Sequence, residues 1–231
     1  MDNIIIKVDG LNKFYPMGEY MFHALKEIDL EIESGEMIAI MGRSGSGKST
    51  LLNIIGTLDS YDSGTYFYGG KDVGEMGDRE KASLRASEIG FVNQEFLLLN
   101  KKTAFFNVAL PLYFGKTPKK EISSRVKMSL SKVSILDQMN KKITDMSGGQ
   151  KQRVAIARAL VTSPKLILAD EPTGALDRET SKEIIACLKE LNEKDGITVI
   201  IVTHDREVAE ECHKIINISD GKITDIEVVA K

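Results

Sequence analysis

The sequence predicts an α/β fold with a largely parallel sheet, because two patterns alternate along the chain. Short apolar runs recur, and segments with the apolar spacing of helices lie between them. Runs without polar interruption are typical of strands buried on both faces, as in parallel sheets. The chain has 231 residues, of which 42% are apolar and 28% charged, which is an ordinary globular composition. A chain of this length can bury a large core without a disulfide or a structural metal.

Five segments have the pattern of strands. Residues 27–33 alternate acidic and apolar side chains, which indicates a strand with one solvated face. Four further runs are short and apolar, as fully buried strands are: 37–41, 89–92, 166–169 and 198–203. Because these runs alternate with helical segments, they favour a sheet that is largely parallel.

Helices are predicted where apolar residues recur every three or four positions. One helix is expected at residues 48–55, and apolar stripes within 154–160 and 184–191 indicate two more. The stretch 95–158 has no convincing strand and several helical segments, including 121–133. We therefore expect this stretch to form a helical insertion in the α/β core.

Charge and cysteine content exclude several classes of protein. The 31 Lys and Arg and 34 Asp and Glu residues leave a net charge of -3, which argues against a protein dedicated to coating nucleic acid. Cys187 and Cys212 form no CxxC pair, which excludes a zinc finger and a disulfide framework and fits a reduced, cytoplasmic compartment. There is no secretory signal pattern, and every apolar run is far below the ~18 residues of a membrane span. Any work at a membrane therefore requires a partner.

Residues 42–49 (GRSGSGKS) match G-x-x-x-x-G-K-[ST], a loop that binds nucleotide phosphates. Glycines let backbone N–H groups surround phosphate oxygens, and the following helix directs its positive N-terminus toward them. Lys48 would supply a charge to the β- and γ-phosphates, and the Ser49 hydroxyl would ligate Mg²⁺. The alternative is a glycine turn before a surface helix. A buried strand at 37–41 before the loop and a helix after it favour the phosphate loop.

The apolar run 166–169 ends in two acids, Asp170 and Glu171. A buried strand that delivers a carboxylate at its carboxyl end is what an Mg²⁺-ATP site needs from its second strand. We expect Asp170 to hold magnesium, mostly through water, and Glu171 to orient or deprotonate the attacking water. Strands often end in an acid at a turn, so this pattern is informative because it accompanies the phosphate loop.

Two other segments are candidates for binding a ligand. His204 directly follows the strand 198–203, at the sheet edge where open α/β folds bind ligands; alternatively, it stands beside a helix cap formed by Asp205. Residues 147–149 (SGG) precede a helix and could form a second anion-binding helix end; the alternative is an ordinary Ser-capped helix. Since the chain has one phosphate loop, the second helix end raises the question of which anion it meets.

Over essentially its full length the chain resembles the nucleotide-binding ATPase of ABC transporters. Beside the phosphate loop, five motifs stand in the family's order. Tyr15 is similar to the family's adenine-stacking aromatic, and Gln94 to its Q-loop glutamine. The signature motif resembles MSGGQ at 146–150, the D-loop resembles GALD at 174–177, and the switch histidine resembles His204. Segments 107–112, 151–158 and 169–177 look like the lipoprotein-releasing and macrolide-exporting (LolD/MacB-type) branch, which includes ATPases of antimicrobial-peptide resistance and sensing systems.

The resemblance implies a role for each matching residue, with ATP and Mg²⁺ as cofactors. Catalysis falls to Glu171, His204, Gln94 and Lys48, and the magnesium ligands are Ser49, Gln94 and Asp170. ATP is contacted by Tyr15, Gly42, Arg43, Ser44, Gly45, Ser46, Gly47, Lys48, Ser49 and Thr50. The ATP of a second subunit is contacted by Ser147, Gly148, Gly149 and Gln150, and Asp177 lies in a loop of the dimer interface.

The resemblance also implies an architecture. The expected fold is a P-loop NTPase (RecA-like) core with a mixed sheet, an antiparallel β subdomain and a helical insertion subdomain. Residues 1–231 would form a single ABC ATPase domain. Within it, 1–94 and 159–231 would form the nucleotide-binding core with its β subdomain, and 95–158 the helical signature subdomain.

For function, the resemblance implies an ATPase that converts ATP and water to ADP and phosphate. It would form a homodimer around two ATP molecules and drive a separate membrane permease with an extracytoplasmic domain, exporting or extracting peptides, lipoproteins or antibiotics. It would be cytoplasmic, attached through the permease to the inner face of the cell membrane, without a nucleic-acid partner. Asn93 and Phe106 depart from the family's pattern on the surface that receives the membrane partner.

Three alternatives remain. A mechanotransmission ABC ATPase would drive a cell-envelope partner without transport. A soluble ABC ATPase acting on ribosomes or DNA usually has paired cassettes or a long coiled-coil insertion, and the net charge also disfavours it. A small-molecule kinase would have little use for the second glycine-rich helix end or for Gln94 and His204.

Overall fold

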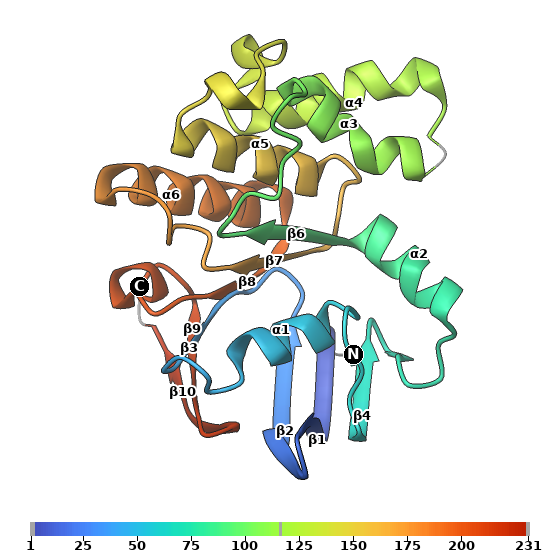
Figure 1. Cartoon of the computed structure of the whole chain (residues 1–231), viewed down its shortest axis with the longest axis vertical. Coiled ribbons are helices and arrows are strands. Elements are labelled where there is room, and N and C mark those ends of the chain that lie inside the picture. The colour runs from blue at the N-terminus through green and yellow to red at the C-terminus, as the bar shows by residue number, and fades with distance from the viewer. Residues whose placement is uncertain (1–2, 116, 230–231) are drawn as a thin grey trace. The chain divides into compact units, whose positions relative to one another are not determined.

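The computed structural model describes residues 3–115 and 117–229 of the chain (Figure 1). They form two compact units: Met1–Arg85 with Thr198–Lys231, and Ala86–Ile197. The subdomain boundaries that the family resemblance implies, after residues 94 and 158, stay a prediction.

The first unit contains two sets of strands, one antiparallel throughout and one with both parallel and antiparallel pairs. The antiparallel sheet has the order β2-β1-β4-β5, with bounds β1 (Ile4–Met17), β2 (Tyr20–Glu33), β4 (Ser63–Tyr68) and β5 (Lys71–Asp72). Elsewhere in the unit, β3 (Met37–Met41) is parallel to both β8 (Thr198–Val202) and β9 (Lys214–Ser219), and β10 (Lys222–Val228) is antiparallel to β9. Helix α1 (Lys48–Ile55) contacts β2 and β8, and α7 (Arg206–Ala209) contacts β3.

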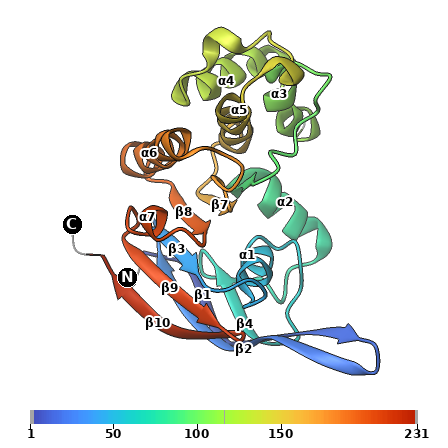
Figure 2. The same ribbon diagram turned by 60° about the vertical axis from the view of Figure 1, so that its left-hand side comes forward.

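Strands β1 and β2 form one long hairpin, whose far end extends away from the rest of its unit in Figure 2. Near its base, Ile6, Val8 and Leu11 are fully buried, whereas Tyr20 beside the turn is 80% exposed. Tyr15 lies where burial gives way to exposure and is itself half-buried. The hairpin thus places the Tyr15 ring at the boundary between the core and the surface.

In the second unit, β6 (Ile89–Asn93) and β7 (Leu166–Asp170) pair in parallel. The helices between and after them are α3 (Ala104–Phe114), α4 (Lys119–Lys132), the 3₁₀ turns η1 (Leu136–Gln138) and η2 (Ile143–Asp145), α5 (Gly148–Leu160) and α6 (Arg178–Asp195). Helix α5 contacts α3, α4, α6 and β6, so it is the central element of this unit. Helix α2 (Asp78–Glu88) contains the residues at which the chain passes from the first unit to the second.

These elements confirm the α/β class and most of the predicted segments. The four buried apolar runs are β3, β6, β7 and β8, and the predicted helices are α1, α4, α5 and α6. Between residues 95 and 158, the described part of the chain has helices and no strand beyond an isolated bridge. The predicted strand 27–33 is only the end of β2. The pattern missed β1 because register shifts interrupt its pairing and break the two-residue alternation.

Gly90 in β6 permits the close approach of α5. A Cβ atom at this position would lie 2.8 Å from the carbonyl oxygen of Ala159 and 3.0 Å from its Cβ. Because both α5 and β6 are packed in the core, we expect Gly90→Ala to lower the free energy of unfolding by about 1–3 kcal/mol, measured by urea denaturation. Gly77→Ala is the matched control, since a Cβ there meets only the Glu80 carboxylate, at 3.7 Å. Equal stability of the two variants would contradict the packing argument.

Candidate functional site

The phosphate loop lies between β3 and α1 in the first unit. Its glycines Gly42, Gly45 and Gly47 have φ angles of 156°, 78° and 105°, in the range that favours glycine. A Cβ at Gly42 would overlap the carbonyl oxygen of Ile218, and one at Gly47 would lie 2.8 Å from that of Ala24. Backbone conformation therefore requires all three glycines, and close packing requires Gly42 and Gly47 as well.

Lys48 and Ser46 give this loop its polar interior. Lys48 is 9% exposed, and its Nζ donates to the carbonyl oxygens of Gly42 and Arg43, both at 2.9 Å. These bonds hold the ammonium inside the loop and use two of its three N–H donors. The Ser46 hydroxyl is buried and has no hydrogen-bond partner among the described residues. Because an unpaired buried hydroxyl costs roughly 1–3 kcal/mol, the loop fits a bound phosphate that would supply the partner.

Tyr15 is held beside the loop by residues of the same unit. Its hydroxyl donates to Asp59 Oδ2 at 2.5 Å and also interacts with the Thr50 side chain. Lys13 Nζ donates to Asp59 Oδ1 at 2.9 Å and lies 4.9 Å from the centre of the Tyr15 ring. Burial and the bond to Asp59 raise the pKa of Tyr15, so its hydroxyl remains a donor. The ring has a fixed orientation, with Lys13 against one face.

Lys13 and Asp59 are site residues that the sequence analysis missed. Burial opposes ionisation of Asp59, but the hydrogen bonds from Tyr15 and Lys13 prevail and lower its pKa. The ion pair joins residues 46 positions apart, and neither residue belongs to a recognised motif. Most lysines are exposed, so the sequence carries no sign that this lysine is buried and paired.

His204 is exposed and follows β8 after Thr203. The Thr203 hydroxyl oxygen accepts a bond from the Asp205 backbone N–H at 3.0 Å, and Asp205 Oδ1 accepts one from the Glu207 N–H at 2.9 Å. Asp205 therefore caps α7, as the alternative interpretation of this segment predicted. The two interpretations of this segment are compatible: Asp205 caps α7, and His204 lies at the carboxyl end of the buried strand β8.

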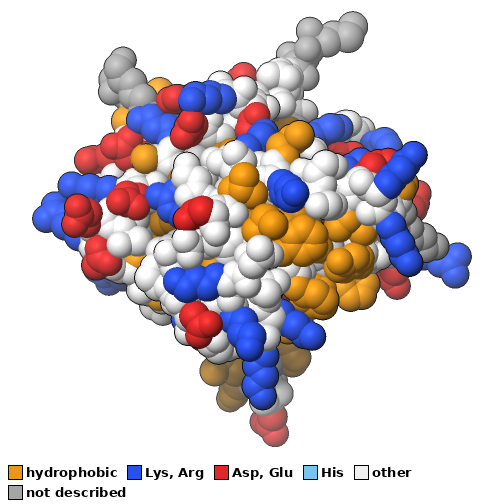
Figure 3. All heavy atoms as spheres, turned by 90° about the horizontal axis from the view of Figure 1, so that it is seen from above, with side chains coloured by type: hydrophobic (Ala, Val, Ile, Leu, Met, Phe, Trp, Pro, Cys, Tyr) orange, Lys and Arg blue, Asp and Glu red, His pale blue; other side chains and the backbone are white. Residues whose placement is uncertain are grey.

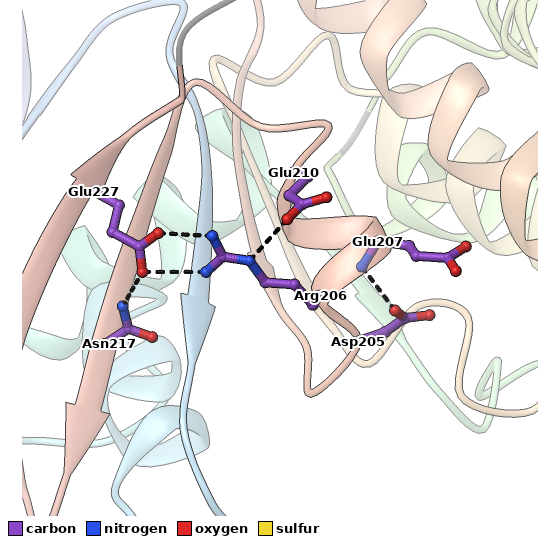
Figure 4. A network of polar contacts seen from close by, with 6 residues as sticks. All are labelled: Asp205, Arg206, Glu207, Glu210, Asn217 and Glu227. Atoms are coloured by element: carbon purple, nitrogen blue, oxygen red, sulfur yellow. Dashed lines mark hydrogen bonds and ion pairs between the residues drawn. The ribbon is translucent and has the colours of Figure 1, made fainter.

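An ion-pair network anchors α7 to β10 (Figure 4). Arg206 donates through both terminal nitrogens to the Glu227 carboxylate, at 3.1 and 2.7 Å, and through Nε to Glu210 at 3.0 Å. Asn217 donates to the same Glu227 at 2.8 Å. Hydrogen bonds from Arg206 and Asn217 lower the pKa of Glu227. The network fixes the start of α7, two residues after His204.

In the second unit, the carboxyl ends of β6 and β7 bring Gln94 toward the acids. Asn93 and Asp170 are partners in the parallel pairing of β6 and β7. Gln94 and Glu171 are the residues that directly follow these two strands. Gly174 packs against the Gln94 side chain, because a Cβ on Gly174 would lie 2.8 Å from Gln94 Nε2. Glu171 has a φ of 48°, a backbone conformation that costs free energy in a residue other than glycine and is typical of functional sites.

The loop after Gln94 is anchored to α5. Phe96 and Leu97 have positive φ angles of 59° and 48°. The Arg158 guanidinium donates to their carbonyl oxygens, at 3.0 Å to Phe96 and 2.5 Å to Leu97. Burial lowers the pKa of Arg158. This arginine, which the sequence analysis assigned no role, holds a strained loop in place.

The SGG segment begins α5 and is packed against the start of α6. Ser147 caps the helix, with its hydroxyl accepting from the Gln150 N–H at 3.3 Å while Gln150 Oε1 accepts from the Ser147 N–H at 3.1 Å. A Cβ on Gly148 would lie 3.1 Å from Leu176, and one on Gly149 would lie 2.5 Å from Thr180. The helix is thus capped by Ser147, and its two glycines allow close contacts with Leu176 and with Thr180 of α6.

Asp177 begins α6. Its Oδ1 accepts a bond from the Thr180 N–H at 2.9 Å, and its Oδ2 accepts one from the Thr180 hydroxyl at 2.7 Å. These bonds lower the pKa of Asp177, led by the backbone bond from Thr180. Asp177 is therefore a helix cap within its own chain, and its predicted place at a dimer interface stays a prediction.

The predicted site residues fall into two sets. Tyr15, the loop 42–50 and His204 belong to the first unit, and Gln94, 147–150, Asp170, Glu171 and Asp177 to the second. Magnesium suits the predicted donor set, since hydroxyl, amide and carboxylate oxygens are hard ligands. Within residues 3–115 and 117–229, no cluster of three or more His, Cys, Asp or Glu side chains could hold a metal. Mg²⁺ commonly binds through one or two carboxylates together with substrate phosphates.

Comparison with known proteins identifies relatives over nearly the whole chain. Residues 25–174 match the sequence model of the ABC transporter family. The chain is 48% identical over 219 residues to the uncharacterized ABC transporter ATP-binding protein YknY of Bacillus subtilis (strain 168), covering 95% of both. It is 44% identical over 219 residues to the macrolide export ATP-binding/permease protein MacB of Aggregatibacter actinomycetemcomitans, covering 95% of this chain and 34% of that protein.

A solved structure extends the likeness to three dimensions. The dimeric post-hydrolysis state of the ATP-binding cassette MJ0796, bound to ADP and Pi, is 43% identical in sequence. The match has a TM-score of 0.89 and covers 98% of this chain and 99% of that one. At this identity the likeness concerns sequence as well as fold.

Proposed function

The chain belongs to the ABC transporter family, and we propose that the site residues of its two units act together on one MgATP. As an ATP-binding cassette it binds and hydrolyses ATP and is the motor of a membrane ABC transporter. The observation that carries the residue-level proposal is the phosphate loop. A triphosphate can be bound by this loop, which has three glycines with positive φ angles, a buried Lys48 and an unpaired Ser46 hydroxyl.

ATP binding is the task of the first unit. Residues 42–50 surround the β- and γ-phosphates with backbone N–H groups, and Lys48 uses its remaining N–H donor on a phosphate oxygen. Adenine stacks on the face of Tyr15 opposite Lys13. The Asp59 carboxylate, held between Tyr15 and Lys13, keeps that ring in position.

Hydrolysis joins residues of both units. Ser49, Gln94 and Asp170 would hold Mg²⁺, which would stabilise negative charge on the phosphoryl oxygens. Glu171 accepts the proton of the attacking water as its oxygen bonds to the γ-phosphorus. The bond from that phosphorus to the β–γ bridging oxygen breaks, and the oxygen leaves on ADP. Gln94 and His204 orient the water and the γ-phosphate.

A second copy completes each site in this proposal. The residues 147–150 at the start of α5 contact the γ-phosphate held by the partner copy, which answers the question of the second anion-binding helix end. Support comes from the geometry of α5, whose Gly148 and Gly149 N–H groups precede the first intrahelical bond. Further support comes from MJ0796, a dimeric cassette bound to ADP and Pi.

The membrane component is a separate permease in this proposal. None of the helices formed by the described residues has the length and apolar content of a membrane span. Hydrophobic side chains gather on the face that Figure 3 shows, viewed from the helical end of the second unit. The exposed apolar residues around α3 include Leu99, Tyr113 and Phe114, the last 82% exposed. Such patches mark interaction sites, and we place the permease contact here, with the complex at the inner face of the membrane.

The proposed transported substrate rests on one named relative and on the resemblance to the LolD/MacB-type branch. MacB carries macrolide export in its name and joins an ATP-binding region to a permease in one chain. We propose export or extraction of peptides, lipoproteins or antibiotics through a permease with an extracytoplasmic domain. Mechanotransmission to a cell-envelope partner without transport is the second candidate, favoured by the same docking face.

The partner can be identified with a hydrolysis-deficient variant. Tagged Glu171→Gln, added with MgATP to detergent-solubilised native membranes, is expected to recover a permease with a large extracytoplasmic domain, identified by mass spectrometry. Lys48→Ala, which lacks the positive charge that contacts the phosphates, is the matched control and should recover less of the permease. Recovery of ribosomal or DNA-bound proteins alone would contradict the permease assignment.

A further inference from the structure

Gln152 is a fully buried amide in α5 that the proposed mechanism does not use. Its Nε2 donates to the carbonyl oxygen of Pro172 at 2.6 Å. Its Oε1 is also buried and has no hydrogen-bond partner among the described residues. An unpaired buried carbonyl oxygen costs roughly 1–3 kcal/mol, which is as much as the bond to Pro172 contributes or more. We therefore infer that the hydrogen bond serves to hold the Pro172 carbonyl in one orientation rather than to stabilise the fold.

The Pro172 carbonyl belongs to the turn that begins with the proposed general base. The Gly174 N–H donates to the carbonyl oxygen of Glu171 at 3.1 Å, which closes a β-turn over Glu171–Gly174. The central peptide of such a turn, between Pro172 and Thr173, can reverse its direction, and this reversal distinguishes type I from type II. Because Gln152 binds the carbonyl of that peptide, it selects one of the two directions.

The same turn supports two proposed site residues. Glu171 is its first residue and has the strained φ of 48°, which persists only where the surroundings enforce it. Gly174 is its last residue and lies against the Gln94 amide, where a Cβ would come within 2.8 Å. A change in the turn would therefore move both the carboxylate that accepts the proton and the surface on which Gln94 rests.

We propose that Gln152 is a positioning residue for ATP hydrolysis, which locks the Glu171–Gly174 turn through its bond to Pro172. This inference rests on the proposed roles of Glu171 and Gln94. Gln152 acts only on the chemical step, since it touches the backbone of the turn and belongs to neither the phosphate loop nor the adenine contact.

Gln152→Met tests the inference, because methionine keeps the length of the side chain and removes the donor. We expect kcat to fall roughly 10- to 100-fold, the cost of a displaced catalytic group, with KM for ATP and the Kd for ATP unchanged. Asn192→Leu is the matched control. Asn192 is also buried in the second unit and donates to a backbone carbonyl, that of Ile197, at 2.7 Å. It should lower the melting temperature while leaving kcat within about twofold of the wild type.

A second variant gives a readout that simple structural damage would not. In Gln152→Glu, a protonated carboxyl can donate to the Pro172 carbonyl, whereas an ionised one cannot. Burial raises the pKa of such a glutamate, so kcat relative to the wild type should fall as pH rises from about 6 to about 9. For Gln152→Met the same ratio should not depend on pH.

Several results would overturn the inference: a Gln152→Met kcat within about twofold of the wild type, a parallel loss of ATP affinity, an equal kcat loss in Asn192→Leu, or a pH-independent ratio for Gln152→Glu. Failure of the proposed function is distinguishable from these, since the wild-type chain would then hydrolyse no ATP with or without its permease.

Discussion

Glu171→Gln is expected to retain ATP binding and to lose ATP turnover by about 10²–10⁴-fold. The amide has nearly the shape of the carboxylate, so the turn that starts at this residue should persist, but it cannot accept the proton of the attacking water. The ATP-bound dimer should accumulate, since the γ-phosphate that bridges the two copies is no longer cleaved. Phosphate release and size-exclusion chromatography with MgATP measure the two effects.

Glu121→Gln is the matched control for this substitution. Glu121 lies on α4 and pairs with Arg125 at 3.0 Å on the surface, so the same chemical change removes only a surface ion pair. Such pairs contribute little to stability, and turnover should not change. Wild-type turnover in Glu171→Gln would rule out this residue as the general base.

Lys48→Ala is expected to weaken ATP binding itself. A hydrogen bond to a charged group is worth about 1.5–3 kcal/mol, so the Kd for ATP should rise about 10- to 150-fold, measured by calorimetry. Lys48 also supports the loop through the carbonyls of Gly42 and Arg43. Lys48→Gln separates the two contributions, because a glutamine can still donate a hydrogen bond and carries no charge.

A matched control and a fold check accompany this measurement. Lys165→Ala removes a lysine that is 68% exposed and paired with Glu88, so ATP affinity should stay at the wild-type value. Melting temperatures show whether either loop variant has lost its fold. An unchanged Kd in both Lys48 variants would exclude a direct contact between this ammonium and ATP.

Local motifs explain why so much of this protein could be predicted from its sequence. The run 37–41, the glycines and the following helix stand in one contiguous segment, and the structure has β3, the loop and α1 there. An uninterrupted apolar run precedes Asp170 and Glu171, and in the structure this run and Asp170 form β7, with Glu171 directly after it. Where bulges interrupt the alternation, as in β1, the pattern failed although the strand is long.

The remaining site residues could not be predicted, because they act across large separations in sequence. Lys13 reaches Asp59 only after the hairpin and β4 pack together, and Arg158 reaches the carbonyls of Phe96 and Leu97 from α5. Their side chains are ordinary, and it is their partners that make them functional. Main-chain carbonyls, which receive most of these bonds, leave no mark in an amino-acid sequence.

The motifs specify the chemistry of this protein: it is an ATPase of the ABC transporter family, with its phosphate loop, acids, SGG segment and histidine at identifiable positions. How those groups are held depends on contacts that exist only in the folded chain. Lys13 and Asp59 hold Tyr15, and Gln152 binds the turn that begins at Glu171 through Pro172, 20 positions later in the chain. The physical reason is that a motif records which groups are present, whereas their orientation depends on buried hydrogen bonds that form only when distant segments pack.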